Sequence, residues 1–351
     1  MTNNVKYIQA DDLRNYCIKL FESVGVPKEE AFINADNLVD ANLSGIDSHG
    51  VSRMGIYLKR IRENVVKPQS RVTIMNEAPA TVSLNGENSM GAVVSKKAME
   101  LAIAKAKETG VSYVTVNNSN HFGTAAYFTK MALNHNMIGF AATNGASRMA
   151  PWGGKEAYFG TNPFSVSIPA GSERPIIVDM ATSVVARGKI IMAQKNSETI
   201  PEGWAMNKDG EFTTSAQEAL DGTVLPFGGP KGSAIALIID VLSGVLAGAA
   251  FGTGIKDMYG NFKEPTNTGH VFGVLNIEKF IAVDLFKSNM DQMIKDIKAN
   301  SPAQGVQEVF LPGEIELRKA EQRLKEGIPI TLPVLRELEE EGRLCGVTFQ
   351  L

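Results

Sequence analysis

The spacing of apolar residues predicts helices at the start of the chain. One apolar set, at residues 13–21, repeats every three to four positions behind two adjacent aspartates that can cap a helix, and it ends near Gly25. A second set follows Pro27, a residue favoured in the first turn of a helix, and continues to position 45. A third covers residues 50–64. We therefore expect an N-terminal group of short helices.

From residue 71 onward, short apolar runs alternate with helical patterns. The expected strands lie at residues 72–74, 81–84, 111–116, 138–143, 164–168, 175–180 and 271–277. The expected helices lie at 91–109, 124–136, 184–195 and 230–250, and the charged tail adds 285–299, 314–325 and 333–341. This alternation predicts an α/β fold with a sheet core at residues 71–284. Helices from the N-terminal segment, residues 1–70, and from the C-terminal segment, residues 285–351, are expected to flank the core and pack together.

The amino-acid composition limits the classes of binding partner and the location that we expect. The 351 residues are 44% hydrophobic and 21% charged, and a net charge of −3 offers no basic surface for nucleic acid. Cys17 and Cys345 are the only cysteines, too few for a disulfide framework or a thiolate metal site. The first residues carry no apolar signal region, which favours a reducing, cytoplasmic location.

The segment 232–251 is apolar and about long enough to span a membrane. Asp240 lies near its centre, where a carboxylate in lipid would be costly. We expect a buried helix here and no membrane partner.

Candidate chemistry is concentrated at residues 46–57, which read IDSHGVSRMGIY. With a helix beginning near Gly50, His49, Arg53 and Tyr57 follow at steps of four and share one face. An imidazole that moves a proton, a guanidinium that holds a carboxylate and a phenol that orients it would make a compact acid-handling site. The alternative is an ordinary helix start with a capping Ser48 and a solvated arginine.

Two further stretches follow predicted strands. His121 lies in an Asn-rich loop directly after the strand at 111–116, where open α/β sheets bind ligands. The loop at 143–169 is rich in Gly, Asn and aromatic residues, and loops of this length are usually functional or disordered. Asp179 ends another apolar strand. Its carboxylate could orient an imidazole or receive a cofactor hydroxyl, or it could cap a helix.

Residues 227–232, reading FGGPKG, precede an apolar helix. Backbone amides at a helix start, with Lys231 beside them, suit a phosphate. The pattern is not a Walker loop, and no GxGxxG follows a strand, so the usual Rossmann fingerprint is missing. The sequence has no HExxH, no CxxC and no EF-hand spacing, so we expect no metal site.

Taken in order, the motifs DSHGxxR…Y, NHFGTAAYF, TNP, DMATS and GPKG resemble the malate/L-lactate dehydrogenase family that lacks a Rossmann fold. That family includes sulfolactate, ureidoglycolate and diketogulonate oxidoreductases and a cyclic-imine reductase. The resemblance spans essentially the whole chain. It implies a non-Rossmann core that binds NAD or NADP, with NAD favoured, a substrate side in the N-terminal segment, and a homodimer.

The resemblance also implies roles for individual residues. In one type of member the counterpart of His121 accepts the proton during alcohol oxidation. In others His49 is the proton donor, or Ser48, His49 and Asp179 form a relay. Arg53 and Tyr57 match substrate-binding positions. The positions that match cofactor contacts are Ser147, Asp179, Met180, Ala181, Lys231, Gly232, Pro312, Gly313 and Glu314.

These observations predict an NAD(P)-dependent oxidoreductase that transfers hydride between nicotinamide and a small 2-hydroxy or 2-oxo acid of malate or lactate type. Ureidoglycolate, diketogulonate or cyclic-imine chemistry on the same scaffold, or a non-enzymatic nucleotide-binding protein, are the alternatives. We expect His121 to be the acid/base and His49 to orient the substrate, with reversed roles as the second hypothesis. Arg148, where many members carry proline or a small residue, is expected to meet a second anionic group; a solvent-exposed arginine is the alternative.

Overall fold

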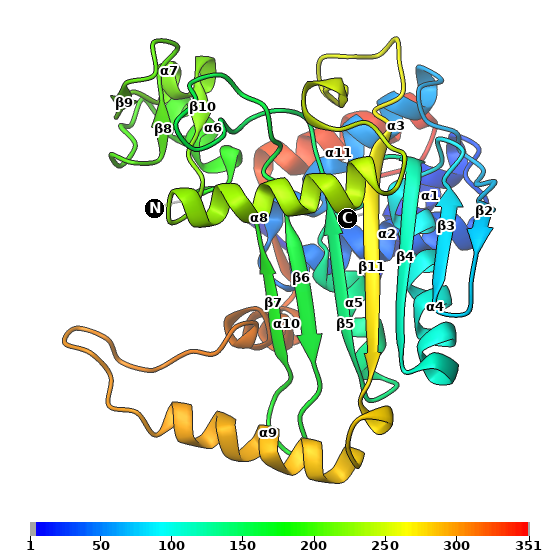
Figure 1. Cartoon of the computed structure of the whole chain (residues 1–351). Helices are drawn as coiled ribbons and strands as arrows, with labels where there is room; N and C mark the ends of the chain where they lie inside the picture. The colour runs from blue at the N-terminus through cyan, green and yellow to red at the C-terminus, as the bar shows by residue number, and fades with distance from the viewer. Residues whose placement is uncertain (1–4, 350–351) are drawn as a thin grey trace.

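The computed structural model describes residues 5–349, and its centre is a seven-stranded sheet (Figure 1). The strand order is β2-β3-β4-β11-β5-β6-β7. The strands are β2 (Thr73–Glu77), β3 (Thr81–Asn85), β4 (Val111–Ser119), β11 (Thr268–Asn276), β5 (Met137–Thr143), β6 (Phe164–Ile168) and β7 (Ile176–Met180). In this sheet β3 and β4 are parallel, and the other neighbouring strands are antiparallel. The predicted α/β class without a Rossmann sheet is therefore confirmed.

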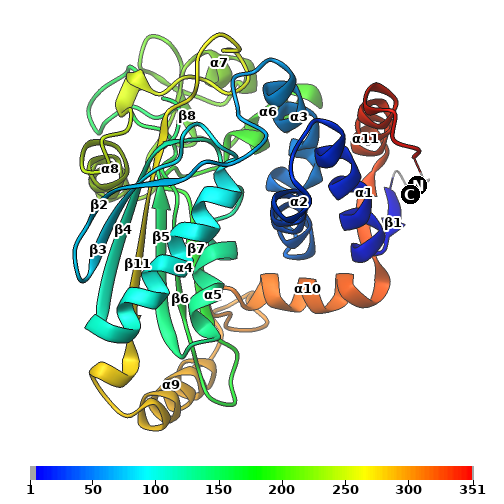
Figure 2. The same cartoon turned by 90° about the vertical axis from the view of Figure 1, so that its right-hand side faces the viewer.

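Helices cover the two faces of the sheet unequally. Val114 and Val116 of β4 point into a core shared with α4 (Gly91–Thr109) and α5 (Ala126–Leu133), because alternate strand residues face the same side. On the opposite face α8 (Pro230–Asp240) crosses the strands (Figure 2). The sheet is thus a middle layer with helices on both of its faces.

The N- and C-terminal helices form one flanking layer (Figure 2). Its members are α1 (Ala10–Ser23), α2 (Lys28–Leu43), α3 (Met54–Arg62), α10 (Glu314–Glu326) and α11 (Leu332–Cys345). Apolar residues from both ends of the chain share a core, and Tyr16 donates its hydroxyl hydrogen bond to the Leu338 carbonyl at 2.9 Å. A two-stranded sheet of β1 (Val5–Ile8) and β12 (Ile328–Thr331) joins the ends and was not predicted.

A small third unit, apart from the helix expected at 184–195, was also missed by the sequence patterns. It contains β8 (Ala205–Met206), β9 (Phe212–Thr213), β10 (Thr223–Val224), α6 (Arg187–Lys195) and α7 (Ala216–Asp221) around its own core. Its strands are two residues long, so they carry too little apolar alternation to be recognised. At the other end of the sheet lies α9 (Val283–Lys298) (Figure 1).

The long apolar segment is not one regular helix. After α8 the chain continues as a π-helical turn, Val241–Val245. The Asp240 carboxylate is buried and accepts hydrogen bonds from Asn144 Nδ2 (2.9 Å) and the Gly252 N–H (3.0 Å). In the described part of the chain, no helix is long and apolar enough to cross a membrane.

His270 lies inside β11, just before the strand expected at 271–277, and is fully buried. Its ring nitrogens lie 2.8 Å from the hydroxyls of Thr143 and Ser119, which joins three neighbouring strands. Burial lowers the pKa of His270 to about 3, so the ring is neutral in the folded protein.

This buried histidine predicts an acid sensitivity of the fold. Below the ordinary pKa of 6.5 the unfolded chain binds a proton that the folded chain does not, so stability falls as the pH drops from 6.5 towards 3. The expected loss is about 1.4 kcal/mol per pH unit from this residue. Urea unfolding at pH 7.0 and 5.5 should show a smaller loss in His270→Gln, whatever its absolute stability. An identical loss in both proteins would contradict the assignment.

Candidate active site

The segment expected to begin a helix at Gly50 instead forms two 3₁₀ turns, Asp47–His49 and Val51–Arg53, and α3 begins only at Met54. The end of α2 holds these turns. Asn42 donates from Nδ2 to Asp47 (2.7 Å) and accepts the Val51 N–H at Oδ1 (2.8 Å). A Cβ at Gly50 would lie 2.1 Å from Asn42 Oδ1, so the close approach requires glycine. His49 and Tyr57 therefore do not share a helix face.

The loop after β4 is held just as closely. Gly91, at the start of α4, packs against the backbone of this loop, and a Cβ there would lie 2.4 Å from the His121 carbonyl oxygen. Gly123 has φ +84° and packs against the Asn37 side chain of α2. His121 is thus placed by the sheet and by two helices, not by a free loop.

The structure brings the two candidate histidines together. The rings of His49 and His121 stack with centroids 5.7 Å apart and planes inclined by 26°. His49 Nδ1 lies 3.0 Å from Ser48 Oγ, and His121 Nδ1 lies 2.6 Å from Tyr57 Oη. Among the described residues neither Nε2 has a hydrogen-bond partner, which leaves that nitrogen of each ring for a ligand.

Both rings are neutral near pH 7. Burial lowers the pKa of His49 to about 4, and the positive charge of Arg53 adds to the effect. Burial also lowers the pKa of His121 well below its usual value, and His49 and Arg53 add to that shift. A neutral imidazole can accept a proton from a substrate hydroxyl.

These rings open on a space of about 260 Å³, which we call the histidine cavity. Its described lining residues are Ser48, His49, Arg53, His121, Phe122, Gly123, Thr143, Asn144, Gly145, Ala146, Arg148, Thr161, Asn162, Pro163, Ala181, Ala186, Arg187, Gly188, Ile255, Lys256, Asp257, Met258, Tyr259, Thr266 and Thr268. Four of them are cations, which makes the cavity suited to an anionic ligand.

Arg53 is held in place on two sides. Its Nε donates to the Ser48 carbonyl at 2.6 Å, and its guanidinium lies over the Tyr259 ring, 5.4 Å from the centroid. The remaining N–H groups can form a paired contact with a carboxylate. Arg53 therefore lies beside both histidines as the predicted substrate clamp requires.

Arg148 also lines the cavity, but it is paired with Asp257. Burial lowers the pKa of Arg148, and the positive charge of Arg187 lowers it further, so the two guanidiniums are neighbours. The loop that carries Asp257 is fastened to α3, because Arg60 donates to the carbonyls of Met258 (3.0 Å) and Asn261 (2.8 Å).

Sequence reasoning missed Arg187, Lys256, Asp257 and Tyr259. Arg187 lies eight residues after Asp179, and this closeness to a candidate site residue could have identified it. The other three lie in a loop between α8 and β11, where charged and aromatic residues occur without a recognisable motif. Only the return of β11 to the middle of the sheet brings this loop to the cavity.

Tyr57, which matches a substrate-binding position, contacts His121 and does not line the histidine cavity. It is buried and is not among the described residues that line the cavity. Its hydroxyl lies 2.6 Å from His121 Nδ1. Tyr57 is therefore placed to orient His121.

We expect Tyr57→Phe to lower kcat about 10-fold with little change in KM, since one orienting hydrogen bond to the imidazole is lost. The pH midpoint of kcat/KM should also move, because the ring loses a partner that depends on its protonation. Steady-state kinetics across pH 5–9 measures both. A variant with raised KM and unchanged kcat would indicate a direct substrate contact instead.

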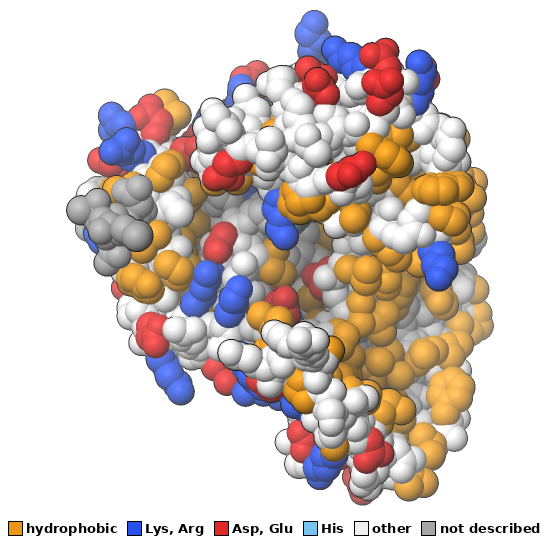
Figure 3. Space-filling model, turned by 90° about the vertical axis from the view of Figure 1, so that its left-hand side faces the viewer, with side chains coloured by type: hydrophobic (Ala, Val, Ile, Leu, Met, Phe, Trp, Pro, Cys, Tyr) orange, Lys and Arg blue, Asp and Glu red, His pale blue; other side chains and the backbone are white. Residues whose placement is uncertain are grey.

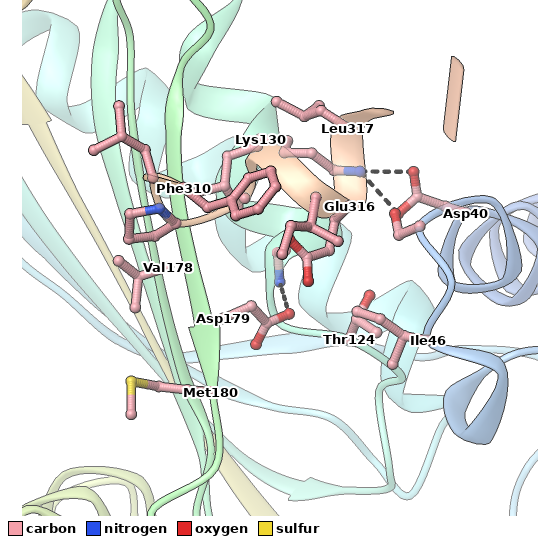
Figure 4. A pocket seen from close by; sticks show the side chains of 17 residues that line it. Asp40, Ile46, Thr124, Lys130, Val178, Asp179, Met180, Phe310, Glu316 and Leu317 are labelled. Atoms are coloured by element: carbon pink, nitrogen blue, oxygen red, sulfur yellow. Dashed lines mark hydrogen bonds and ion pairs between the residues drawn. The ribbon is translucent and has the colours of Figure 1, made fainter. Parts of the chain in front are cut away.

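A second space of about 430 Å³, the β7–α10 pocket, lies between β7 and the start of α10 (Figure 4). Its described lining residues are Asp40, Ser44, Ile46, Thr124, Ala126, Lys130, Ile177, Val178, Asp179, Met180, Phe310, Leu311, Pro312, Gly313, Ile315, Glu316 and Leu317. Four positions matched to cofactor contacts, Asp179, Met180, Pro312 and Gly313, thus lie together. The Ile177 N–H donates to the Pro312 carbonyl at 3.0 Å, which fixes that segment beside β7.

Asp179 does not cap the helix that follows it, since the N-cap of α6 is Ala186; its carboxylate instead contacts the start of α5. Its Oδ2 accepts the Ala126 N–H at 2.9 Å, at the first residue of α5. Burial raises the pKa of Asp179 to about 6. In the described part of the chain no hydrogen bond joins Asp179 to Ser48 or His49, so the relay implied by the resemblance is not formed here.

Three chain segments contribute neighbouring residues to both spaces. In the first segment Ile46 lines the β7–α10 pocket and Ser48 lines the histidine cavity. In the second, Thr124 lines the pocket and Gly123 the cavity. In the third, Met180 lines the pocket and Ala181 the cavity. A ligand with two ring systems joined by a linker could therefore occupy both.

The remaining predicted cofactor positions differ in their surroundings. A Cβ at Gly232 would lie 3.0 Å from the Thr182 carbonyl oxygen, so this turn touches the chain just after Ala181. The Lys231 and Gly232 amides already donate to Gly228 and Phe227 carbonyls at 3.4 and 3.0 Å. A phosphate here would therefore have to be met by the exposed Lys231 ammonium, not by the helix-start amides that we expected.

Ser147 and Glu314 make contacts within the protein. The exposed Ser147 hydroxyl donates to the Tyr158 carbonyl at 2.7 Å. The buried Glu314 carboxylate accepts from Lys298 Nζ at 2.8 and 2.9 Å and pairs with Arg318, and it does not line the β7–α10 pocket. It holds the segment that forms the pocket wall.

Several known proteins are similar to this chain in sequence and fold. Residues 8–339 match the model of a family described as malate/L-lactate dehydrogenase. The L-sulfolactate dehydrogenase of Methanocaldococcus jannaschii is 41% identical over 98% of each chain, and a solved structure of sulfolactate dehydrogenase from that organism superimposes with a TM-score of 0.92 at 40% identity over 98% of each chain. The malate dehydrogenase of Pyrococcus abyssi is 40% identical over 98% of this chain and 96% of its own.

The names of less similar relatives specify both nicotinamide cofactors. The ureidoglycolate dehydrogenase (NAD(+)) of Escherichia coli O157:H7 is 35% identical over 87% of each chain. The (2R)-3-sulfolactate dehydrogenase (NADP(+)) of Chromohalobacter salexigens is 33% identical over 76% of this chain and 80% of its own. The similarity covers the whole fold and the ordered motifs that build both spaces, and this chain belongs to the malate/L-lactate dehydrogenase family.

Proposed function

We propose that this protein is an NAD-dependent dehydrogenase of 2-hydroxy acids that carry a second anionic group, such as malate or 3-sulfolactate. The observation that carries the proposal is the histidine cavity, where two neutral imidazoles lie beside cations at two positions. The printed names of the most similar relatives, sulfolactate and malate dehydrogenases, support the same substrate class.

In the oxidation of such an acid, His121 accepts the hydroxyl proton at Nε2, in the neutral tautomer whose Nδ1–H donates to Tyr57 Oη. The bound nicotinamide supplies the hydride acceptor. Tyr57 holds the His121 ring through Nδ1, and His49 stacks against it, so that the base keeps one orientation. Burial keeps the ring neutral and ready to accept a proton at pH 7.

The two anionic groups of the substrate are held apart by different arginines. Arg53, next to the histidines, binds the carboxylate beside the reacting carbon. Arg148, with Arg187 as its neighbour, binds the distal group after the Asp257 carboxylate gives way. Asp257 thus occupies the place that the distal anion takes in the complex.

We also propose that the protein acts as a homodimer, as the family resemblance implies. An apolar strip of α8 and the following turn is exposed, with Leu237, Ile238, Val245 and Leu246 each more than half accessible. Figure 3 shows apolar side chains gathered along the side of the molecule where α8 lies. Patches of this kind mark association surfaces. Light scattering coupled to size-exclusion chromatography measures the mass directly; a monomer would refute this part.

A spectrophotometric screen tests the proposed function. NADH and NADPH are combined with oxaloacetate, sulfopyruvate, pyruvate, diketogulonate and piperideine-carboxylate, and the absorbance at 340 nm is followed. We expect the highest kcat/KM for NADH with oxaloacetate or sulfopyruvate. No reaction with any pair would exclude the proposed activity, and a preference for the cyclic imine would replace it.

A further inference from the structure

One wall of the histidine cavity is formed by residues 255–266, which we call the cavity loop. Five consecutive residues, Ile255 to Tyr259, line the cavity, and none of residues 255–266 belongs to a helix or strand. The loop lies between α8 and β11 and passes beside α3 at the top of Figure 1. Its position at the site therefore depends on side-chain contacts with other segments.

Two charge-assisted contacts fasten the cavity loop to different parts of the chain. Asp257 pairs with Arg148, which follows β5. Arg60, on α3, donates from Nη1 to the carbonyls of Met258 (3.0 Å) and Asn261 (2.8 Å). Bonds of this kind are stronger than those between neutral groups. The loop is thus held by one segment that leaves the sheet and by one helix of the flanking layer.

Two aromatic residues of the loop also contact cations at α3. The Arg53 guanidinium lies over the Tyr259 ring, 5.4 Å from its centroid, and Lys59 Nζ lies 4.2 Å from the centroid of the Phe262 ring. Tyr259 and Lys59 are exposed, and such contacts are weak at exposed sites. The first contact matters for the substrate, because it supports the arginine assigned to the substrate carboxylate.

The surroundings of Arg60 indicate that it is placed for this loop. The residue is only 2% exposed, and among the described residues its Nε and Nη2 are buried without a hydrogen-bond partner. A buried cation is costly unless groups of the protein replace its water. In the described part of the chain, the two carbonyls of the cavity loop are the hydrogen-bond acceptors that do so.

We propose that Arg60 is a positioning residue for substrates with two anionic groups, because it holds the cavity loop after such a substrate displaces Asp257 from Arg148. The inference rests on the proposed function, which assigns the distal anion to Arg148. Lactate has no distal anion, so the Asp257–Arg148 pair stays intact and the loop keeps both fastenings. With malate that pair is exchanged for the substrate, and Arg60 is the charge-assisted contact that keeps Tyr259 against Arg53.

The kinetic test compares malate and lactate in two backgrounds at saturating NAD. Arg60→Met removes the donors and leaves no unpaired buried charge. It should raise KM about 10-fold for malate and less than about 2-fold for lactate, with little change in kcat. Asp257→Asn removes the ion pair and keeps the Oδ1 acceptor of the Tyr259 and Gly260 amides. In that background Arg60→Met should raise KM about 10-fold for lactate as well.

Two further variants separate this role from damage to the fold. Arg60→Lys keeps an ammonium donor near the carbonyls and should raise the KM for malate only about 3-fold. Arg62→Met is the matched control, since it removes another arginine of α3, one that pairs with Glu341 at 2.8 Å. It should leave the ratio of the malate and lactate KM values unchanged. General damage to the fold would affect both acids alike.

Hydrogen–deuterium exchange of residues 255–266 tests the two fastenings without substrate or turnover. The exchange rate should rise less than about 3-fold in Arg60→Met and in Asp257→Asn, and at least about 10-fold in the double variant, where neither contact remains.

Equal rises of KM for malate and lactate in Arg60→Met would overturn the inference, as would a double variant whose loop exchanges at the wild-type rate. A full rise of exchange in Arg60→Met alone would also contradict it, because Asp257 would then hold nothing. These outcomes are separate from the failure of the proposed function. A protein that oxidises neither acid refutes that function while exchange still reports the fastenings, and an active enzyme whose KM ratio ignores Arg60 refutes only the role of this residue.

Discussion

His121→Gln is expected to lower kcat by about 10²- to 10⁴-fold, the usual contribution of a positioned general base. Glutamine keeps a polar group of similar size but cannot carry the proton. His49→Gln should lower kcat less and raise KM more, because His49 stacks on His121 and orients the bound acid. Steady-state kinetics in the oxidation direction, with saturating NAD, measures both variants.

His135→Gln is the matched control, since this exposed histidine lies outside the cavity and follows α5. A larger kcat loss in His49→Gln than in His121→Gln would reverse the two roles. The pH profile adds an independent readout. Because the pKa of His121 is lowered, the wild-type kcat/KM for oxidation should remain high as the pH falls to 6.5 and decline only below it. A midpoint above 6.5 would contradict a buried neutral base.

Arg148→Leu is expected to lower kcat/KM for malate by about 100-fold, equal to ~2.7 kcal/mol, while leaving lactate nearly unchanged. The distal carboxylate loses its guanidinium, and lactate has no group at that position. The ratio of the two specificity constants is the decisive measurement, because it cancels general damage to the site. Arg336→Leu, which changes an exposed arginine on α11, is the control.

Removing Arg148 also leaves Asp257 without its partner, which could disturb the loop over the cavity. The double variant Arg148→Leu/Asp257→Asn separates the two effects, because it removes both charges together. It should keep the low malate-to-lactate ratio, with a lactate activity equal to that of the wild type. Equal use of both acids by the wild type, unchanged in Arg148→Leu, would show that the arginine binds no substrate group.

Elements that depend on local sequence could be predicted closely. The helix α4, the strand β6 and the turn between β2 and β3 agree with their apolar patterns, because propensity and capping act within a few residues. The start of α3 was wrong by four residues. Its position depends on Asn42, whose side chain bonds to Asp47 and Val51, and no local pattern reports such a contact.

Some residues of the candidate site could be recognised from the sequence, whereas the contacts of others could not. His49, Arg53 and His121 were recognised from motifs, since their residue types and spacing carry the chemistry. Tyr57 matched a substrate-binding position, and only the structure shows that its hydroxyl contacts His121. Three roles were considered for Asp179, and only the structure shows that it contacts the start of α5. Both depend on where α3 and α5 lie against β4 and β7, which is a matter of packing.

The sequence by itself determined the family, the α/β class and the candidate histidines, because ordered motifs and apolar periodicity are properties of the sequence alone. Only the tertiary structure decided that Arg148 meets Asp257, that the two spaces are lined by neighbouring residues of three segments, and that Glu316 lines the same pocket as Asp179. The physical reason is that these relations join segments far apart in the chain. They exist only after β11 enters the middle of the sheet and α10 packs against α2.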